Sequence, residues 1–342
     1  MNTPSISFTS LGLVVLDEIR FPHQEPLLDI LGGSGAYATL GARLFLRHPL
    51  SHTLGWMIHT GNDFPKLMEE RLKSWNATLI VEREADKPST RAKHFTYTTP
   101  LLPVHDSNLK NTPLLTSKAY HYLETPPDMK TRLSCLLALR KEAAGTLELE
   151  PDRPFIIWEP APWSCKPENL QPTLDAAHVV DVLSPNHLEL AALFGEPPAT
   201  AHDKAMIESL TQKVLESGVG PDGKGTVVVR AGENGSVVVA RDIPPTWLPP
   251  FYTSGPAGEQ HSKIVDPTGA GNAFLGAYAV GYLRTGNAVE AACYGTVGGS
   301  FALEQVGMPE LFSSEGGELW NGADVLGRLR EYRESVGLGT LV

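Results

Sequence analysis

Short apolar runs alternate with longer segments of helical character along almost the whole chain, and this alternation limits the available folds more than any other feature. The runs have the length of buried strands, and the segments between them read as helices. Strands that alternate with helices are typical of a mostly parallel sheet covered on both faces, so the sequence predicts an α/β fold. Expected strands lie at 11–16, 53–58, 119–123, 155–158, 179–183, 227–229 and 236–240, with exposed strands or a hairpin at 78–99. Expected helices lie at 36–46, 64–74, 129–144, 187–194, 204–217, 273–283, 288–304 and 323–335.

One segment, residues 266–274 (DPTGAGNAF), places a glycine-rich turn directly before a helix. Glycines at such a position let several backbone N–H groups converge on one point. That point also lies at the positive end of the helix dipole, which suits an anion such as a phosphate. A glycine-rich turn by itself more often marks an ordinary helix entry, so its meaning depends on the other motifs of the chain.

Composition narrows the classes of partner. The 342 residues carry a formal net charge of −11, which argues against a nucleic-acid binder because no basic face would meet the phosphates. Three widely separated cysteines (Cys135, Cys165 and Cys293) form neither a disulfide framework nor a zinc pattern. The first ten residues lack the features of a signal peptide, and no run approaches the roughly 20 apolar residues that span a bilayer. We therefore expect a cytoplasmic protein without nucleic-acid or membrane partners.

Two further glycine-rich segments imitate nucleotide-binding motifs. Residues 218–224 (GVGPDGK) imitate a P-loop, but Gly225 replaces the metal-binding Ser or Thr, and a helix precedes the segment where a strand should. Residues 32–35 (GGSG) lack the G-x-G-x-x-G spacing of a dinucleotide site, which disfavours a nicotinamide-dependent dehydrogenase.

Several motifs, each unremarkable alone, occur in one specific order between residues 12 and 308. The motifs are Gly12…Asp17, Gly32-Gly33, residues 61–64 (GNDF), Asn186-x-x-Glu189, Arg230-Ala231-Gly232 and residues 266–272. This order resembles that of the PfkB family of ribokinase-like carbohydrate kinases, and within it the fungal maintenance-of-killer proteins look most similar. The resemblance implies a single ribokinase-like domain over 1–342, a three-layer sandwich with a small, reduced β lid near 18–31 and 78–104.

The resemblance also implies roles for individual residues. The hydroxylated phosphoryl acceptor would meet Asp17, Gly32, Gly33, Tyr37 and Thr90. The transferring phosphoryl group would meet Gly269, Ala270 and Gly271, with Asn272 at the position of the catalytic base. ATP would meet Asn186, Arg230, Gly232, Gly235 and Thr296. Mg²⁺ would be organised through water by Glu189, and a monovalent cation such as K⁺ by Asp266 and Thr268.

The chain departs from the family pattern at the position of the catalytic base. The family has Asp where this chain has Asn272, and an amide cannot accept a proton near neutral pH. A general base contributes on the order of 10²- to 10⁴-fold in rate. Phosphoryl transfer depends mainly on positioning and charge stabilisation, which the turn and a metal could still supply.

Two functions therefore remain open: an ATP- and Mg²⁺-dependent phosphotransferase acting on a small sugar- or nucleoside-like acceptor, and a pseudokinase that binds nucleotide or serves as a scaffold without turnover. Tyr37 would narrow the acceptor pocket, which disfavours ribose and fructose. A homodimer formed through the lid is one option in this family, and the sequence leaves it open.

Overall fold

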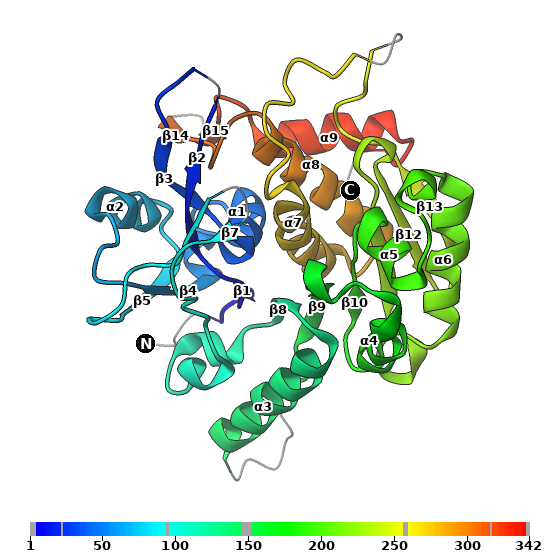
Figure 1. The fold of residues 1–342 in the computed structure, drawn as a ribbon, viewed down its shortest axis with the longest axis horizontal. Helices are drawn as coiled ribbons and strands as arrows, with labels where there is room; N and C mark the ends of the chain where they lie inside the picture. Colours follow the sequence, from blue (N-terminus) through cyan, green and yellow to red (C-terminus); the bar gives the residue numbers. More distant parts are fainter. Residues whose placement is uncertain are drawn as a thin grey trace.

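The computed structural model describes residues 5–21, 23–93, 96–145, 152–255, 259–314 and 317–339. Its centre is a nine-stranded sheet, parallel from β11 to β5 and extended by two antiparallel strands at one edge (Figure 1). The expected α/β fold with a mostly parallel sheet is confirmed. In spatial order the strands are β13 (Ile243–Leu248), β12 (Ser236–Ala240), β11 (Thr226–Arg230), β10 (Val182–Leu183), β9 (Phe155–Pro160), β8 (Ala119–Glu124), β1 (Phe8–Ser10), β4 (Leu54–Thr60) and β5 (Thr78–Arg83).

Helices cover both faces of this sheet because its strands are apolar on both sides. In β11, Val228 packs into one core cluster, whereas Val227 and Val229 pack into the other. The first cluster is covered by α1 (Ser34–Phe45), α2 (Lys66–Ser74), α7 (Ala270–Thr285), α8 (Ala288–Leu303) and α9 (Val325–Ser335). The second is covered by α3 (Pro126–Ala144), α4 (Leu170–Ala177), α5 (His187–Phe194) and α6 (Lys204–Glu216). None of the described helices is long and apolar enough to cross a lipid bilayer.

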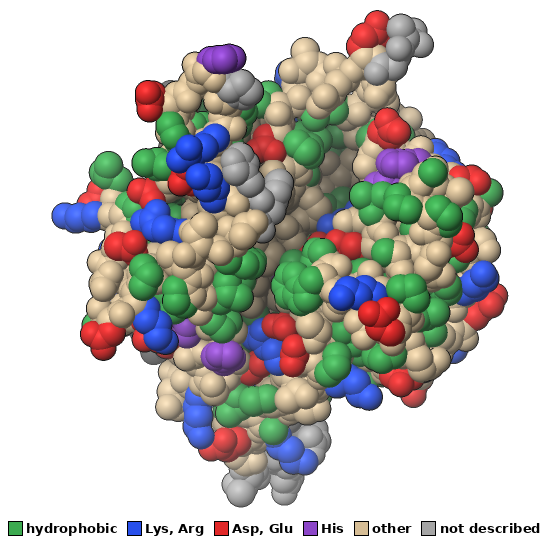
Figure 2. Space-filling model, viewed as in Figure 1, with side chains coloured by type: hydrophobic (Ala, Val, Ile, Leu, Met, Phe, Trp, Pro, Cys, Tyr) green, Lys and Arg blue, Asp and Glu red, His purple; other side chains and the backbone are tan. Residues whose placement is uncertain are grey.

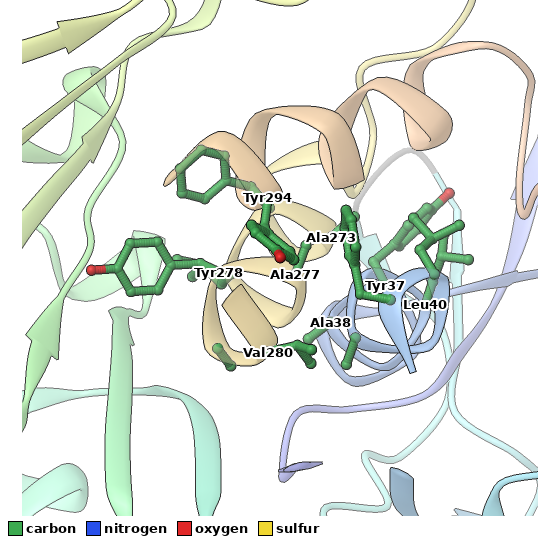
Figure 3. Packing of buried hydrophobic residues seen from close by; sticks show 14 of the residues in the cluster. Tyr37, Ala38, Leu40, Ala273, Ala277, Tyr278, Val280 and Tyr294 are labelled. Carbon is green, nitrogen blue, oxygen red and sulfur yellow. The ribbon is translucent and has the colours of Figure 1, made fainter. Parts of the chain in front are cut away.

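The helices α1 and α7 approach each other closely. A Cβ at Gly41 would overlap the carbonyl oxygen of Ala273, and a Cβ at Gly276 would overlap that of Ala38. Figure 3 shows Ala38 of α1 on the side of the helix that faces Ala277 of α7. Two glycines thus allow backbone-to-backbone packing, which fixes the beginning of α7 relative to the sheet.

A second, four-stranded sheet stands beside the main one, in the spatial order β3 (Leu27–Gly32), β2 (Val15–Ile19), β6 (Arg91–Lys93) and β7 (Thr96–Tyr97). The single strand expected at 11–16 is wrong. The main-sheet strand β1 ends at Ser10, and Asp17 lies on β2 of the small sheet. The apolar run hid the break at Gly12, where a Cβ would overlap Ser34 Oγ of α1.

The second expected lid segment divides between the two sheets. Its first strand, β5, pairs with β4 in the main sheet, and only β6 and β7 join the small one. Residues 22, 94 and 95 of the expected lid segments lie outside the described residues.

Several elements were not expected from the sequence. The strand β13 contains Pro244 and Pro245 and forms the edge of the sheet, where proline is tolerated. The helix α4 and a hairpin of β14 (Leu311–Ser314) and β15 (Gly317–Trp320) were also missed. The P-loop-like residues form a turn between α6 and β11, in agreement with the rejection of a P-loop, and Gly220 and Gly223 have positive φ.

Candidate active site

Four strands of the central sheet each place a polar side chain two positions after an apolar one, on the face that α7 covers; three of them are adjacent, and β10 separates the fourth, β11, from β9. The apolar members of the core cluster on that face are Phe8, Ala119, Ile157 and Val228. Because alternate residues of a strand share a face, the residue two positions later on each strand points to the same side. These residues, called the polar row below, are Ser10 of β1, His121 of β8, Glu159 of β9 and Arg230 of β11. They lie toward the carboxyl ends of parallel strands, where open α/β sheets bind their ligands.

Contacts between side chains connect the polar row across the sheet. Ser10 Oγ and His121 Nδ1 are 3.0 Å apart, and His121 Nε2 lies 3.5 Å from Glu159 Oε2. The other carboxylate oxygen, Glu159 Oε1, lies 2.7 Å from Arg230 Nη2. Arg230 Nη2 also donates a hydrogen bond of 2.9 Å to the carbonyl oxygen of Ser184. Glu159 is therefore held between His121 on one side and Arg230 on the other.

Glu159 is a buried carboxylate, with 4% of the residue exposed. Burial opposes its ionisation, but the positive charge of Arg230 and the contact with His121 outweigh burial and hold the pKa of Glu159 below its usual range. Reasoning from the sequence missed Glu159 and His121 as site residues. The available signal was a charged or polar residue inside an apolar strand, in FIIWEP and AYHYLE.

The glycine-rich turn lies directly against this row. Gly269 caps α7 with φ of 75°, a conformation that favours glycine. The first i→i−4 bond of the helix runs from the N–H of Ala273 to Gly269 O at 2.9 Å, so the N–H groups of Gly271 and Asn272 precede it. A Cβ at Gly271 would overlap Arg230 Nη1, and Asn272 Nδ2 donates a hydrogen bond to Glu159 Oε2. Ala270 lies in the same turn, where its N–H donates to Pro267 O at 3.3 Å.

Arg230 has a hydrogen-bond donor without a partner at this turn. Its side chain is only 12% exposed, and its Nε is buried without a hydrogen-bond partner in the part of the chain that the structure describes. A buried donor of this kind usually has a partner. Backbone N–H groups and an under-used guanidinium therefore meet at one point, an arrangement suited to a phosphate.

Asn186 and Glu189 cap the helix α5 reciprocally. The N–H of Glu189 donates to Asn186 Oδ1 at 2.8 Å, and the N–H of Asn186 donates to Glu189 Oε2 at 2.7 Å. Glu189 Oε2 also lies 3.7 Å from Arg230 Nη2. Burial raises the pKa of Glu189 to about 7, against the opposing charge of Arg230 and helped by the like charge of Glu159. The pair thus belongs to the same charged cluster as the polar row.

The other residues expected around the nucleotide surround this cluster. Gly232, at φ of 57°, begins the turn after β11. Gly235 ends that turn at φ of 86°, where a Cβ would overlap Leu248 O of β13. Thr296 lies on α8, one turn before Gly299, whose ideal Cβ is 3.2 Å from Ala270 O. The structure thus places all three on elements that border the turn or the end of β11.

The expected acceptor residues lie on the opposite side of the turn. Asp17 projects over Gly32, where a Cβ would overlap Asp17 Oδ2, and Gly33 caps α1 at φ of 93°. The ring of Tyr37 packs on Gly269, where a Cβ would overlap it. Burial, then the charge of Asp266, raises the pKa of Asp17 to about 6. Burial, then the charges of Asp266 and Asp17, likewise raises the pKa of Tyr37.

Three expected residues have local structural partners. Thr90 is buried in the small sheet, where its Oγ1 accepts from the N–H of Leu102 at 2.9 Å. The Thr90 hydroxyl therefore bonds to the backbone of its own segment beside the small sheet. Asp266 Oδ1 accepts from the N–H of Thr268 at 2.9 Å, which closes the turn before α7.

A hollow in the molecular surface accompanies these residues. Figure 2 shows it between the half that carries the small sheet and the half that carries α5 and α6, with charged side chains of both signs along it. A cavity of about 170 Å³ opens on the small sheet beside Asp17, and Arg91 and Asp29 also line it. Among the described residues, no three His, Cys, Asp or Glu side chains form a group that could hold a metal ion by themselves.

Comparison with known proteins relates the chain to others over nearly its whole length. A model of the pfkB family of carbohydrate kinases matches residues 60–312. An uncharacterized protein of Schizosaccharomyces pombe is 33% identical, over 98% of this chain and 95% of its own length. Protein MAK32 of Saccharomyces cerevisiae is 26% identical, over 98% of this chain and 94% of its own length. The structure of Arabidopsis thaliana ribokinase complexed with ribose and ATP matches 89% of this chain and 95% of its own, with a TM-score of 0.59 at 18% identity. The expected ribokinase-like fold is confirmed.

Proposed function

Because the chain belongs to the PfkB family of carbohydrate kinases, we propose that it transfers the γ-phosphoryl group of ATP to a hydroxyl of a small sugar- or nucleoside-like acceptor. The observation that carries this proposal is the turn before α7. There the N–H groups of Gly271 and Asn272 and the guanidinium of Arg230 meet beside a buried carboxylate.

The turn would stabilise the charge on the transferring phosphoryl group. Negative charge spreads over its oxygens during transfer, and donors that are already in place stabilise it without reorganising. The guanidinium of Arg230 adds a full positive charge in a largely buried place, where electrostatic interactions are stronger than in water. Asn186, Gly232, Gly235 and Thr296 would border the rest of the nucleotide.

Magnesium fits this site only together with the nucleotide. Mg²⁺ keeps several waters and is usually held by one or two carboxylates plus substrate phosphates. Glu189 offers one carboxylate beside the turn. Arg230 lies next to it but already pairs with Glu159, which leaves the Glu189 carboxylate available to the metal. Mg²⁺ bound there with the nucleotide would supply neutralisation of phosphate charge. We also retain Asp266 and Thr268 as the proposed loop for a monovalent cation such as K⁺.

The acceptor would lie between the small sheet and the turn. Asp17 would accept hydrogen bonds from its hydroxyl groups, and the ring of Tyr37 would form one wall beside Gly269. Gly32 and Gly33 would let the acceptor approach the backbone. Because Thr90 uses its hydroxyl within the lid, we propose that it shapes the small sheet rather than contacting the acceptor.

The proposal is tested by phosphoryl transfer and nucleotide binding in the Gly271→Val variant. A valine side chain would overlap Arg230 and block the turn, so we expect transfer to a panel of sugars and nucleosides to fall by 10²-fold or more, on the order of the loss of one oxyanion donor. Leu283→Val, near the other end of α7, is the matched control because the Leu283 side chain is exposed there. Unchanged transfer by Gly271→Val would place the phosphate site elsewhere.

Asn272 favours a second candidate, a pseudokinase that binds nucleotide without turnover. ATP with Mg²⁺ should raise the melting temperature in both cases. Stabilisation by the nucleotide without transfer to any acceptor would support the pseudokinase, and transfer would exclude it. No shift with any nucleotide would contradict both.

A further inference from the structure

The side chain of Asn272 contacts a carboxylate. Its amide nitrogen Nδ2 donates to Glu159 Oε2, so a carboxylate lies one hydrogen bond away from the tip of residue 272. Glu159 comes from β9 and Asn272 from the first turn of α7, 113 residues apart in sequence. The charge that residue 272 lacks is therefore present at nearly the same place, supplied by another element.

Glu159 has more than one partner, and its two oxygens face different groups. Oε1 lies 2.7 Å from Arg230 Nη2. Oε2 faces Asn272 and lies 3.5 Å from His121 Nε2. A carboxylate needed only to neutralise Arg230 would require the first contact alone. The second oxygen is instead held at the end of α7, beside the N–H groups proposed to receive the phosphoryl group.

We propose that Glu159 is the proton acceptor of the phosphoryl transfer inferred above, in place of a carboxylate at residue 272; this inference rests on the proposed function. The acceptor oxygen forms a bond to the γ-phosphorus while the bond from that phosphorus to the β,γ-bridging oxygen breaks, and ADP leaves with that electron pair. The hydroxyl proton passes to Glu159 Oε2 and leaves to water after the product. Asn272 orients the carboxylate through its N–H and presents its own oxygen, Oδ1, as a hydrogen-bond acceptor.

A role for Glu159 in orienting Asn272 and a role as the base predict different results for the Glu159→Gln variant. Glutamine at 159 keeps the size of the side chain and an oxygen that can accept from Asn272, but it cannot take a proton. If Glu159 only holds Asn272 in place, Glu159→Gln should keep most of the activity. If Glu159 is the base, the variant should lose about 10²-fold or more of the transfer rate, the contribution of a general base.

The experiment compares the wild type with Glu159→Gln, Asn272→Asp and the double variant, measuring the transfer rate, the ATP dissociation constant and the melting temperature. In Asn272→Asp two carboxylates would share one site and could not both ionise easily, so we expect no gain over the wild type. The double variant exchanges the acid and the amide between positions 159 and 272. We expect its transfer rate to return to within about tenfold of the wild-type rate, well above the rate of Glu159→Gln. Such a recovery would restore most of the general-base contribution. Glu290→Gln is the matched control, because Glu290 also pairs with a buried arginine, Arg333, at 2.7 Å.

The outcomes separate this inference from the proposed function. Near-normal transfer by Glu159→Gln, or a tenfold gain by Asn272→Asp alone, would overturn Glu159 as the base and leave the phosphotransferase standing. An inactive wild type beside an active double variant would also overturn it. Inactivity of all four proteins would overturn the proposed function and this inference together. Melting temperatures and ATP affinities show whether Glu159→Gln has simply lost its fold.

Discussion

Asp17 holds a carboxylate where the fold resists its ionisation. It lies on β2 of the small sheet, over Gly32. Burial, then the nearby charge of Asp266, raises its pKa to about 6. At neutral pH the side chain is ionised at a cost to folding, which is typical of a group retained for binding rather than for stability.

Replacing Asp17 by Asn should therefore stabilise the protein in a pH-dependent way. The folded state keeps its proton up to about pH 6, whereas the unfolded chain releases it near pH 4. Stability thus falls as pH rises through this window, and the loss persists above it. With allowance for solvent screening, we expect Asp17→Asn to raise the free energy of unfolding by about 1–2 kcal/mol at pH 8 and by much less at pH 4.

Urea unfolding at the two pH values measures this difference. Asp222→Asn is a suitable control, because the Asp222 side chain is 81% exposed. Equal effects of Asp17→Asn at pH 4 and pH 8 would show that the gain does not come from the charge. If Asp17 binds the acceptor, the same variant should also raise the KM for the acceptor while leaving the KM for ATP unchanged.

At the scale of elements, the contact between α1 and α7 determines where the glycine-rich turn before α7 lies. The helices meet through Gly41 and Gly276, where added side-chain atoms would strike backbone carbonyl oxygens. Backbone atoms cannot rotate away as a flexible side chain can, so a substitution there must separate the helices.

Gly41→Ala tests the importance of this contact. We expect a loss of about 1–3 kcal/mol in the free energy of unfolding, typical of overpacking. Because the Cβ would displace the first turn of α7, the stabilisation by ATP should also decrease. Gly327→Ala in the first turn of α9 is the control, since the atoms nearest to its Cβ belong to the side chain of Asp324 rather than to a backbone carbonyl. A Gly41→Ala protein with normal melting and normal ATP response would show that the helices separate without cost.

Elements with strong local signals were predicted well, and those defined by distant contacts were not. The helix α5 and the strand β12 have the bounds that their patterns predicted, because apolar spacing and a capping pair specify them locally. The end of β1 depends on how closely Gly12 approaches α1, which no local pattern reveals. The turn residues of the site were identified from the family motif. Glu159 was missed because its role depends on a contact with Asn272 across 113 positions.

At the scale of the whole molecule, the small sheet is linked to the main one by a network around Arg91 of β6. Arg91 Nη2 lies 3.1 Å from Asp63 Oδ2 in the loop after β4, and Arg91 also pairs with Asp29 of β3. These side chains are 30% to 40% exposed, so each pair contributes only about 0.2–1 kcal/mol. Their effect should thus be on the position of the small sheet rather than on global stability.

Arg91→Ala should loosen the small sheet without unfolding the protein. We expect faster hydrogen exchange at the amides of β2 and β6, with a change in the free energy of unfolding below about 1 kcal/mol. Arg20→Ala is the control, because Arg20 pairs only locally with Glu18 among the described residues. Unchanged exchange in Arg91→Ala would mean that backbone pairing alone positions the small sheet.

The strand β3 runs without a linker through Gly33 into α1, and α1 in turn rests on α7 backbone against backbone. Closely packed backbone compresses little, so we expect a displacement of the small sheet to move the first turn of α7 as well. If the proposed function holds, binding of the acceptor would then alter the affinity for the nucleotide through this packed connection.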